Sequence, residues 1–165
     1  MRKNLYMNRL GKKAKFASLN LTKTSIDKKN SVLKYFCKYL KDNSQKILIA
    51  NKKDMALAKS KKISDSMLDR LELNNKKIDK IIKNIKEVKK FKNSLGKILT
   101  SWKRPNGLVI KKVSIPIGVI GVIYESRPNV TSDVSALCFK TGNAVILRGG
   151  SEAFYSNKIL SQLFR

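Results

Sequence analysis

The sequence predicts an α/β fold: a helical first part, then a β-hairpin, then the start of a parallel sheet. Before residue 95, apolar residues recur at helical spacing among many lysines. After residue 116, two short apolar runs alternate with helical patterns. Unbroken apolar runs are typical of strands covered on both faces, as in parallel sheets. We therefore expect an incomplete parallel sheet with helices on both sides.

The last part of the chain is expected to form strand, helix, strand and helix. Gly118–Tyr124 and Ala144–Leu147 are the two expected strands. Gly142 stops the helix between them. The expected apolar stripe of that helix consists of Val130, Val134, Leu137 and Cys138. Polar loops at 125–129 and 148–152 follow the strands, at the edge where open parallel sheets bind ligands.

The first part is expected to begin with two helices. Residues 1–19 form a basic helix, and a second helix starts at a cap within 24–27 and ends near Asn43. The first helix has four apolar residues as its expected contacts: Leu5, Leu10, Phe16 and Leu19.

Three further helices are expected before the strands. The third helix starts at Ser44 and contains Asn51 and Asp54 in its middle, so we expect a kink or an interruption there. A short helix starts at Ser64, and a clearly amphipathic helix follows and ends near Phe91.

Two short strands, 98–102 and 108–113, are expected to form a hairpin. Arg104-Pro105-Asn106-Gly107 joins them, and a Pro-Asn-Gly sequence is a turn signal because glycine tolerates positive φ. Trp102 is either a contact residue on the projecting hairpin or a core aromatic beneath it. The basic tip should be exposed.

Composition excludes several classes of protein. No apolar run reaches about 20 residues, so no transmembrane helix is expected. No apolar segment of signal-peptide length follows the basic start. The chain has no histidine, and Cys37 and Cys138 lack metal-ligand neighbours. A metal site, a disulfide scaffold and a histidine-based triad are therefore not expected, and a reducing cytoplasm is the expected compartment.

The net charge of +26 is concentrated in the first part, because only five of the 37 Lys and Arg residues follow Pro116. The charge has two interpretations: a solvated, lysine-rich surface or a polyanion-binding site. Arginine and aromatic residues, which nucleic-acid-binding proteins favour, are few here. We expect no specific nucleic-acid partner.

Several short motifs, in order and at fitting distances, resemble the gamma-glutamyl phosphate reductase family, a branch of the aldehyde dehydrogenase superfamily. The resemblance covers nearly the whole chain from about Gly11. Its motifs are Leu68-Asp69-Arg70-Leu71, Trp102-x-Arg104-Pro105-Asn106-Gly107, Glu125-x-Arg127-Pro128-Asn129-Val130-Thr131-x-Asp133, Lys140-x-Gly142-Asn143-Ala144, Leu147-Arg148-Gly149-Gly150-x-Glu152-Ala153 and Ser156-Asn157.

The resemblance implies a fold and a reaction. The fold would be aldehyde dehydrogenase-like: residues 1–95 the helical part of the cofactor domain, 96–115 an oligomerisation hairpin, and 116–165 the start of a Rossmann-like NADP-binding sheet. The reaction would be the NADPH-dependent reduction of gamma-glutamyl phosphate to glutamate 5-semialdehyde, with release of phosphate, in cytoplasmic proline biosynthesis. The full-length protein would be a homo-oligomer, and the chain would be an amino-terminal fragment without the catalytic domain.

In this scheme a cysteine thiolate attacks the acyl phosphate. That cysteine would come from the catalytic domain, which is absent from this chain. Cys138 and Cys37 lie on apolar helical stripes, where burial raises the pKa of a thiol and makes it inert. We therefore expect the nucleophile to lie outside these residues. A fragment of this kind is expected to have no reductase activity alone.

The resemblance also implies roles for residues of the two loops. Asn129 would donate its amide N–H to the substrate oxyanion; the alternative is a plain helix cap. Arg127 would bind the substrate carboxylate or phosphate; the alternative is an ion pair with Glu125 or Asp133. Thr131 and Asp133 are expected to be helix-start residues.

The second loop is the expected cofactor site. The resemblance places Arg148 against the ribose or the 2′-phosphate of NADP(H), and Gly149 and Gly150 would let backbone approach the cofactor. Ser151 and Glu152 would contact it as well, or they would only cap the next helix. No GxGxxG sequence is present, so the usual Rossmann fingerprint is missing.

Two other functions stay open from the sequence. One is another aldehyde dehydrogenase-like enzyme with a different acyl or aldehyde substrate. The other is a basic nucleic-acid-binding protein, which would show tight, steeply salt-dependent RNA binding.

Overall fold

The computed structural model describes residues 2–92 and 95–165. Met1, Asn93 and Ser94 lie outside the described residues, and so do the parts of the expected helical region that fall on them. The elements are α1 (Arg2–Thr22), α2 (Ile26–Asp42), α3 (Ser44–Ser60), α4 (Asp65–Leu71), α5 (Asn75–Lys90), β1 (Ile98–Lys103), β2 (Val109–Val113), β3 (Val119–Tyr124), α6 (Pro128–Lys140), β4 (Ala144–Gly149), η1 (Ser151–Ala153) and α7 (Phe154–Phe164).

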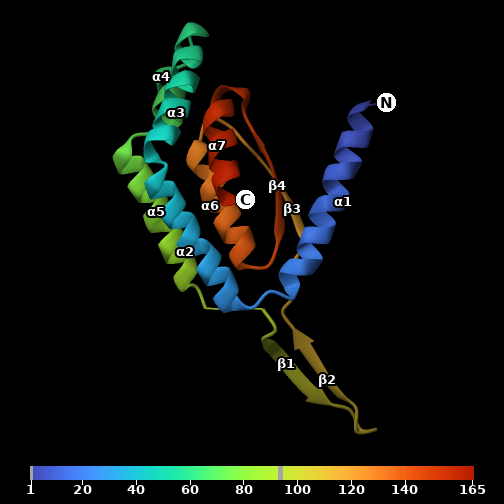
Figure 1. Ribbon diagram of the computed structural model, residues 1–165. Helices are drawn as coiled ribbons and strands as arrows, with labels where there is room; N and C mark the ends of the chain where they lie inside the picture. The colour runs from blue at the N-terminus through green and yellow to red at the C-terminus, as the bar shows by residue number, and fades with distance from the viewer. Residues whose placement is uncertain (1, 93–94) are drawn as a thin grey trace.

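Helices lie on both faces of a two-stranded parallel sheet formed by β3 and β4 (Figure 1). α1 lies on one face, mainly against β4, and α6 lies on the other with α7 beside it. α2, α3 and α5 form an outer layer against α6 and α7. The strands pair from Val119 opposite Ala144 to Tyr124 opposite Gly149, so the loops that follow them are neighbours. The predicted α/β arrangement with a parallel strand pair is confirmed.

One apolar core joins the helical layers. α5 illustrates how it forms, because its four isoleucines are spaced three and four residues apart and share one buried face. Burying one such side chain stabilises the fold by about 1.5–3 kcal/mol. The side-chain oxygen of Asn74 accepts the Lys77 backbone N–H at 2.9 Å and so caps this helix. The core includes Leu33, Phe36, Leu40, Ile47, Ile78, Ile81, Ile85, Ala136 and Leu160.

α1 contacts the sheet through residues other than those expected. Leu5, Phe16 and Leu19 are exposed, whereas Ala14 and Ser18 are buried. The expectation was wrong for these three residues, whereas Leu10 is partly buried. Short side chains are the ones that let a helix approach a sheet closely.

α3 is a continuous helix from Ser44 to Ser60, so the expected interruption at Asn51 and Asp54 was wrong. Both side chains are buried, and their polar atoms bind partners on other elements. The amide nitrogen of Asn51 donates to the Leu71 carbonyl at 2.8 Å, and its oxygen accepts the Leu73 N–H at 2.7 Å. Since these side chains do not compete for the helix's own backbone groups, they leave α3 uninterrupted.

The prediction of which residues of β3 and α6 are buried was wrong in part. Ile123 is 84% exposed, because α1 lies mainly against β4 and leaves that face of β3 open. Leu137, assigned to the buried stripe of α6, is 43% exposed. The buried face of α6 instead consists largely of small and polar residues: Thr131, Ser132, Ser135, Ala136 and Cys138.

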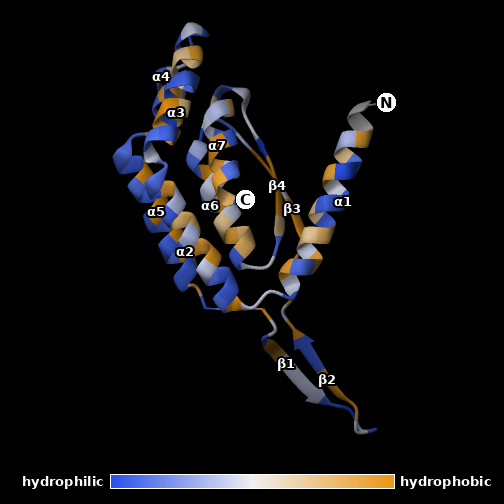
Figure 2. Cartoon of the chain, in the orientation of Figure 1, coloured by the Kyte–Doolittle hydropathy of each residue, from blue (hydrophilic) through white to orange (hydrophobic). Residues whose placement is uncertain are grey.

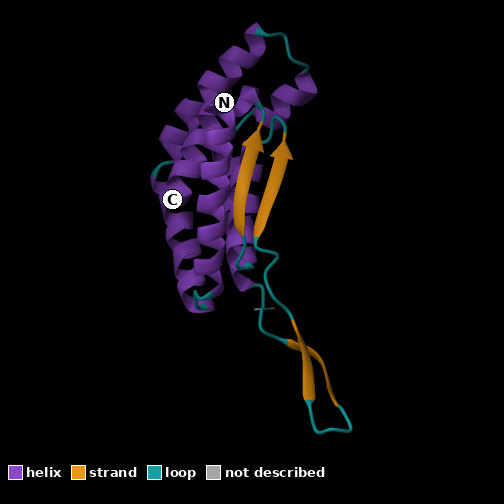
Figure 3. Cartoon of the chain, turned by 90° about the vertical axis from the view of Figure 1, so that its right-hand side faces the viewer, coloured by secondary structure: helices purple, strands orange, loops and turns teal. Residues whose placement is uncertain are grey.

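β1 and β2 form an antiparallel hairpin that extends away from the body as a separate ribbon (Figure 3). Apolar residues, coloured orange in Figure 2, occur on the hairpin as they do on β3 and β4. Trp102 is 43% exposed, so the alternative of a core aromatic beneath the hairpin was wrong for this chain. Ile98, Leu99 and Val109 are also exposed.

Candidate active site

The loop after β3 and the loop after β4 are joined by one carboxylate. Glu152 Oε1 accepts the Ser126 backbone N–H at 2.7 Å and the Ser126 hydroxyl at 3.0 Å. Ser126 is buried and has φ +37°, in the left-handed region that side chains rarely adopt. The paired strands and the two hydrogen bonds between Glu152 and Ser126, here called the Glu152–Ser126 bridge, hold the two predicted loops together.

The bridge changes the acidity of Glu152. Burial by itself would raise the pKa of its carboxyl group. Hydrogen bonds from its own backbone N–H and from Ser126, with a smaller contribution from the charge of Lys61, outweigh burial and lower the pKa. Glu152 is therefore an ionised acceptor near neutral pH, and its Oε1 atom is already used inside the chain.

Gly149 and Gly150 have side chains of other residues close to their backbone. A Cβ atom at Gly149 would collide with the Asn157 amide and meet the Tyr124 ring at 3.1 Å, and one at Gly150 would collide with the Glu152 carboxylate. The glycines thus let other side chains of the chain come close to the backbone.

A second polar network fixes the end of β3 against two helices. Thr131 donates to Asn157 Oδ1 at 2.8 Å, so the Tyr124 hydroxyl is the donor in its 2.6 Å bond to Thr131. Burial raises the pKa of Tyr124. These residues link β3, α6 and α7. Sequence reasoning assigned no role to Tyr124 or Asn157, although Ser156-Asn157 is among the family motifs.

Asn129 is the second residue of α6, and the cap position belongs to Arg127. The cap alternative for Asn129 was therefore wrong. Its amide nitrogen donates to Asp133 Oδ2 at 3.1 Å, and Asn84 of α5 donates to the other carboxylate oxygen at 3.4 Å. Burial raises the pKa of Asp133, and the two amide bonds and the charge of Lys80 oppose that rise. Asp133 orients the Asn129 amide at the carboxyl edge of the sheet.

Arg127 and Asn129 line a cleft of about 300 Å³ between the start of α6 and the α4–α5 corner. Within residues 2–92 and 95–165, Arg127 forms no ion pair with Glu125 or Asp133, so that alternative finds no support. The cleft also contains Arg70 and Lys80. Sequence reasoning missed both, although Arg70 lies in the Leu68–Leu71 motif.

Arg148 and Ser151 are exposed beside the glycine loop. The Arg148 guanidinium donates only a long bond, 3.4 Å, to the neighbouring Gly149 carbonyl. A cation with free donors at this edge of the sheet fits an anionic nucleotide. These residues therefore fit the expected cofactor better than Glu152, which is bound to Ser126.

Both cysteines are buried, as expected. Burial raises the pKa of Cys37 and of Cys138. In the described part of the chain, no helix is long and apolar enough to cross a membrane. No cluster of three or more His, Cys, Asp or Glu residues suited to a metal occurs there either.

Comparison with known proteins points to one enzyme. No family model matches the chain. A gamma-glutamyl phosphate reductase of Carboxydothermus hydrogenoformans is 50% identical over 154 residues, which are 93% of this chain and 37% of the relative. The crystal structure of gamma-glutamyl phosphate reductase from Thermotoga maritima has a TM-score of 0.90 at 40% identity, over 93% of this chain and 37% of that one.

A proposed aldehyde dehydrogenase from Bacillus subtilis shares the fold, with a TM-score of 0.66 at 19% identity over 92% of this chain and 31% of that one. The chain thus has an aldehyde dehydrogenase-like fold. Its expected resemblance to gamma-glutamyl phosphate reductase is confirmed along nearly its whole length. The chain spans 37% of the length of the first curated relatives that it matches.

Proposed function

We propose that the chain forms the cofactor side of a cytoplasmic, NADPH-dependent reductase in proline biosynthesis. The enzyme converts L-glutamate 5-phosphate to L-glutamate 5-semialdehyde and releases phosphate. The observation that carries this proposal is the 50% identity to a gamma-glutamyl phosphate reductase across 93% of the chain. The neighbouring loops after β3 and β4 support it, because that sheet edge is where such folds bind nucleotides.

In the proposed reaction, Asn129 donates an amide N–H to the acyl oxygen as negative charge develops there. Asp133 holds the Asn129 side chain through the 3.1 Å bond. Arg127 binds an anionic group of the substrate from the same cleft. The nucleophilic cysteine lies outside these residues, since both thiols here are buried in structural positions.

Arg148, Gly149, Gly150 and Ser151 are the proposed holders of NADP(H). When bound, the nicotinamide nucleotide supplies the hydride. Arg148 meets its ribose or 2′-phosphate, and Ser151 offers a hydroxyl at the start of η1. Glu152 acts mainly through Ser126, by keeping the two loops together.

The hairpin is the proposed oligomerisation surface of the full-length enzyme. Its exposed Trp102, Ile98 and Leu99 support this role, because exposed apolar residues on a projecting ribbon are typical of interfaces.

A chimaera tests the function. This chain replaces the matching 154-residue segment of the Carboxydothermus enzyme. We expect reduction of NADP⁺ that depends on both glutamate 5-semialdehyde and phosphate. A soluble, folded chimaera that lacks this activity, or that acts on another aldehyde without phosphate, would contradict the proposal.

Two variants of the chimaera test the residues. Asn129→Ala should lower kcat about 100- to 1,000-fold, the usual cost of losing one oxyanion donor. Arg148→Ala should raise the KM for NADPH more than the KM for the acyl phosphate. Lys158→Ala, an exposed cation on α7, is the matched control and should change neither.

A further inference from the structure

The cleft beside Asn129 is lined by six charged residues, and their pairing is uneven. Lys77 Nζ lies 3.4 Å from Asp69 Oδ1 and 4.0 Å from Glu72 Oε2, so one lysine serves both carboxylates. Arg70, Lys80 and Arg127 form no ion pair with any described residue. Three cations therefore line one small cleft without a salt bridge, although the charge of Lys80 also acts on Asp133 behind Asn129.

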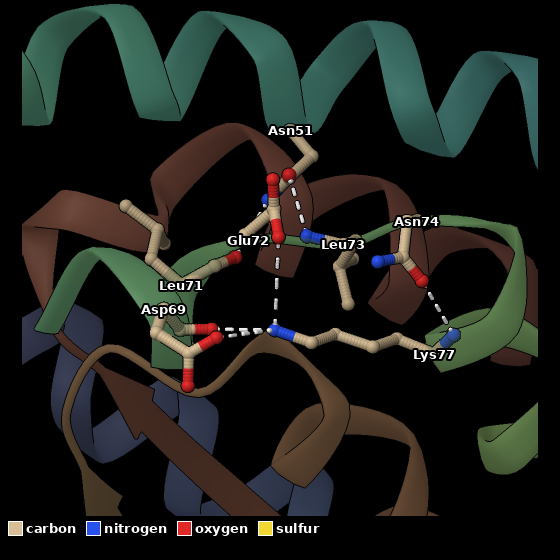
Figure 4. A network of polar contacts seen from close by, with 7 residues as sticks. All are labelled: Asn51, Asp69, Leu71, Glu72, Leu73, Asn74 and Lys77. Carbon is tan, nitrogen blue, oxygen red and sulfur yellow. Dashed lines mark hydrogen bonds and ion pairs between the residues drawn. The ribbon is translucent and has the colours of Figure 1, made fainter. Parts of the chain in front are cut away.

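The backbone on both sides of Arg70 is held in place (Figure 4). Before it, Lys77 Nζ donates to the Asp69 carbonyl at 2.5 Å. After it, the buried Asn51 donates to the Leu71 carbonyl and accepts the Leu73 N–H. The α4–α5 corner is thus fixed at the position from which Arg70 lines the cleft.

The opposite wall of the cleft adds further positive potential. α6 has 13 residues, no acidic residue in its first turn and no side-chain hydrogen bond at its cap. The start of a helix carries partial positive charge on its free N–H groups and attracts oxyanions. Arg127, at the cap position, adds a full charge at the same place.

We propose that Arg70 and Lys80, together with Arg127, form a binding subsite for an oxyanionic group of the substrate, either its phosphate or its carboxylate. The inference rests on the proposed function and adds two residues on α4 and α5 to it. A guanidinium presents paired donors that match the oxygens of phosphate or carboxylate, and a lysine adds a point charge. Because Asn129 lines the same cleft, the anion and the reacting carbonyl belong to one small molecule.

The kinetic test measures the reverse reaction of the chimaera, in which glutamate 5-semialdehyde, phosphate and NADP⁺ are the substrates. Arg70→Gln and Lys80→Gln should each raise the KM for phosphate or the KM for glutamate 5-semialdehyde about tenfold, and the KM for NADP⁺ should stay unchanged. The substrate whose KM rises identifies the bound group. Lys83→Gln, one turn along α5 and outside the cleft, is the control. Unchanged KM values for both substrates would overturn the subsite while leaving the function intact.

A second test needs no turnover and separates the subsite from the proposed function. Inorganic phosphate is titrated into the 165-residue chain, and the amide signals of Asn129 and Val130 are followed by NMR. We expect saturable shifts that the Arg70→Gln, Lys80→Gln double variant loses and that Lys83→Gln keeps. Absence of shifts in the unaltered chain, or equal shifts in the double variant, would overturn the inference. If the chimaera is inactive and the shifts persist, only the proposed function fails.

Discussion

Glu152 and Ser126 lie 26 residues apart in sequence, yet the Glu152 carboxylate accepts both the N–H and the hydroxyl of Ser126, at 2.7 and 3.0 Å. This one side chain joins the loops that follow the two parallel strands. It also relates the arrangement of the candidate site to pH, because only an ionised carboxylate accepts both bonds well.

The first prediction concerns acid stability. The pKa of Glu152 is lower in the folded chain than its ordinary value of 4.5, so its stabilising effect is complete above about pH 4.5 and is lost as the pH falls toward the folded-state pKa. Glu152→Gln should flatten the pH dependence of the unfolding free energy in that window. Urea denaturation at a series of pH values measures this, and an unchanged slope would contradict the bridge.

The second prediction compares two strand glycines. Gly149→Ala should destabilise the fold by about 1–3 kcal/mol, the usual cost of overpacking, because its Cβ would collide with Asn157 and press on Tyr124. Gly121→Ala is the control, since its Cβ would meet nothing within 4 Å and its φ is not positive. Thermal unfolding of both variants checks the difference, and equal melting temperatures would rule out this steric role.

The third prediction concerns Asp54, which caps a helix far away in sequence. Its two carboxylate oxygens accept the Tyr155 and Ser156 backbone N–H groups at 3.0 and 2.7 Å, at the start of α7. The cap position of that helix is Ala153, which offers no side-chain acceptor. Asp54→Ala should cost about 1–3 kcal/mol, because two N–H groups lose their acceptor.

Asp42→Ala is the control for this experiment, since Asp42 is exposed at the end of α2. Chemical denaturation compares the two variants. A loss for Asp54→Ala no larger than that for Asp42→Ala would show that α7 needs no cap from α3.

The fourth prediction concerns the thiols. Burial raises the pKa of Cys37 and of Cys138, so neither should react with a thiol reagent such as DTNB while the chain is folded. Both should react once urea unfolds it. Rapid labelling of Cys138 under native conditions would contradict its burial and reopen its rejection as a nucleophile.

The local sequence was sufficient to predict most of the helices and strands. The isoleucines of α5 recur at helical spacing, and the apolar runs of β3 and β4 are short and rich in β-branched residues, as is typical of buried strands. The errors arose where distant residues decide the outcome. Asn51 and Asp54 are unfavourable inside an isolated helix, but Leu71, Leu73 and Ser156 supply their partners across the fold.

The candidate site was predictable only in part for the same reason. The two loops could be located because both follow expected strands, and parallel pairing makes such loops neighbours. The cleft that joins Arg70 to Arg127 depends on how α4 and α5 turn toward α6. No local pattern encodes that contact, and the motif around Arg70 gave the only signal of its importance.

The hairpin begins and ends at nearly the same point, since the Gly96 N–H donates to the Ser114 carbonyl at 2.9 Å. The side chains of the hairpin take no part in the two apolar clusters formed by the described residues of the body. The hairpin is therefore packed separately from the body. Its length and tip can change by insertion, deletion or exchange while α5 and β3 remain connected across the same short gap. Changes of this kind would leave the pairing of β3 with β4 undisturbed.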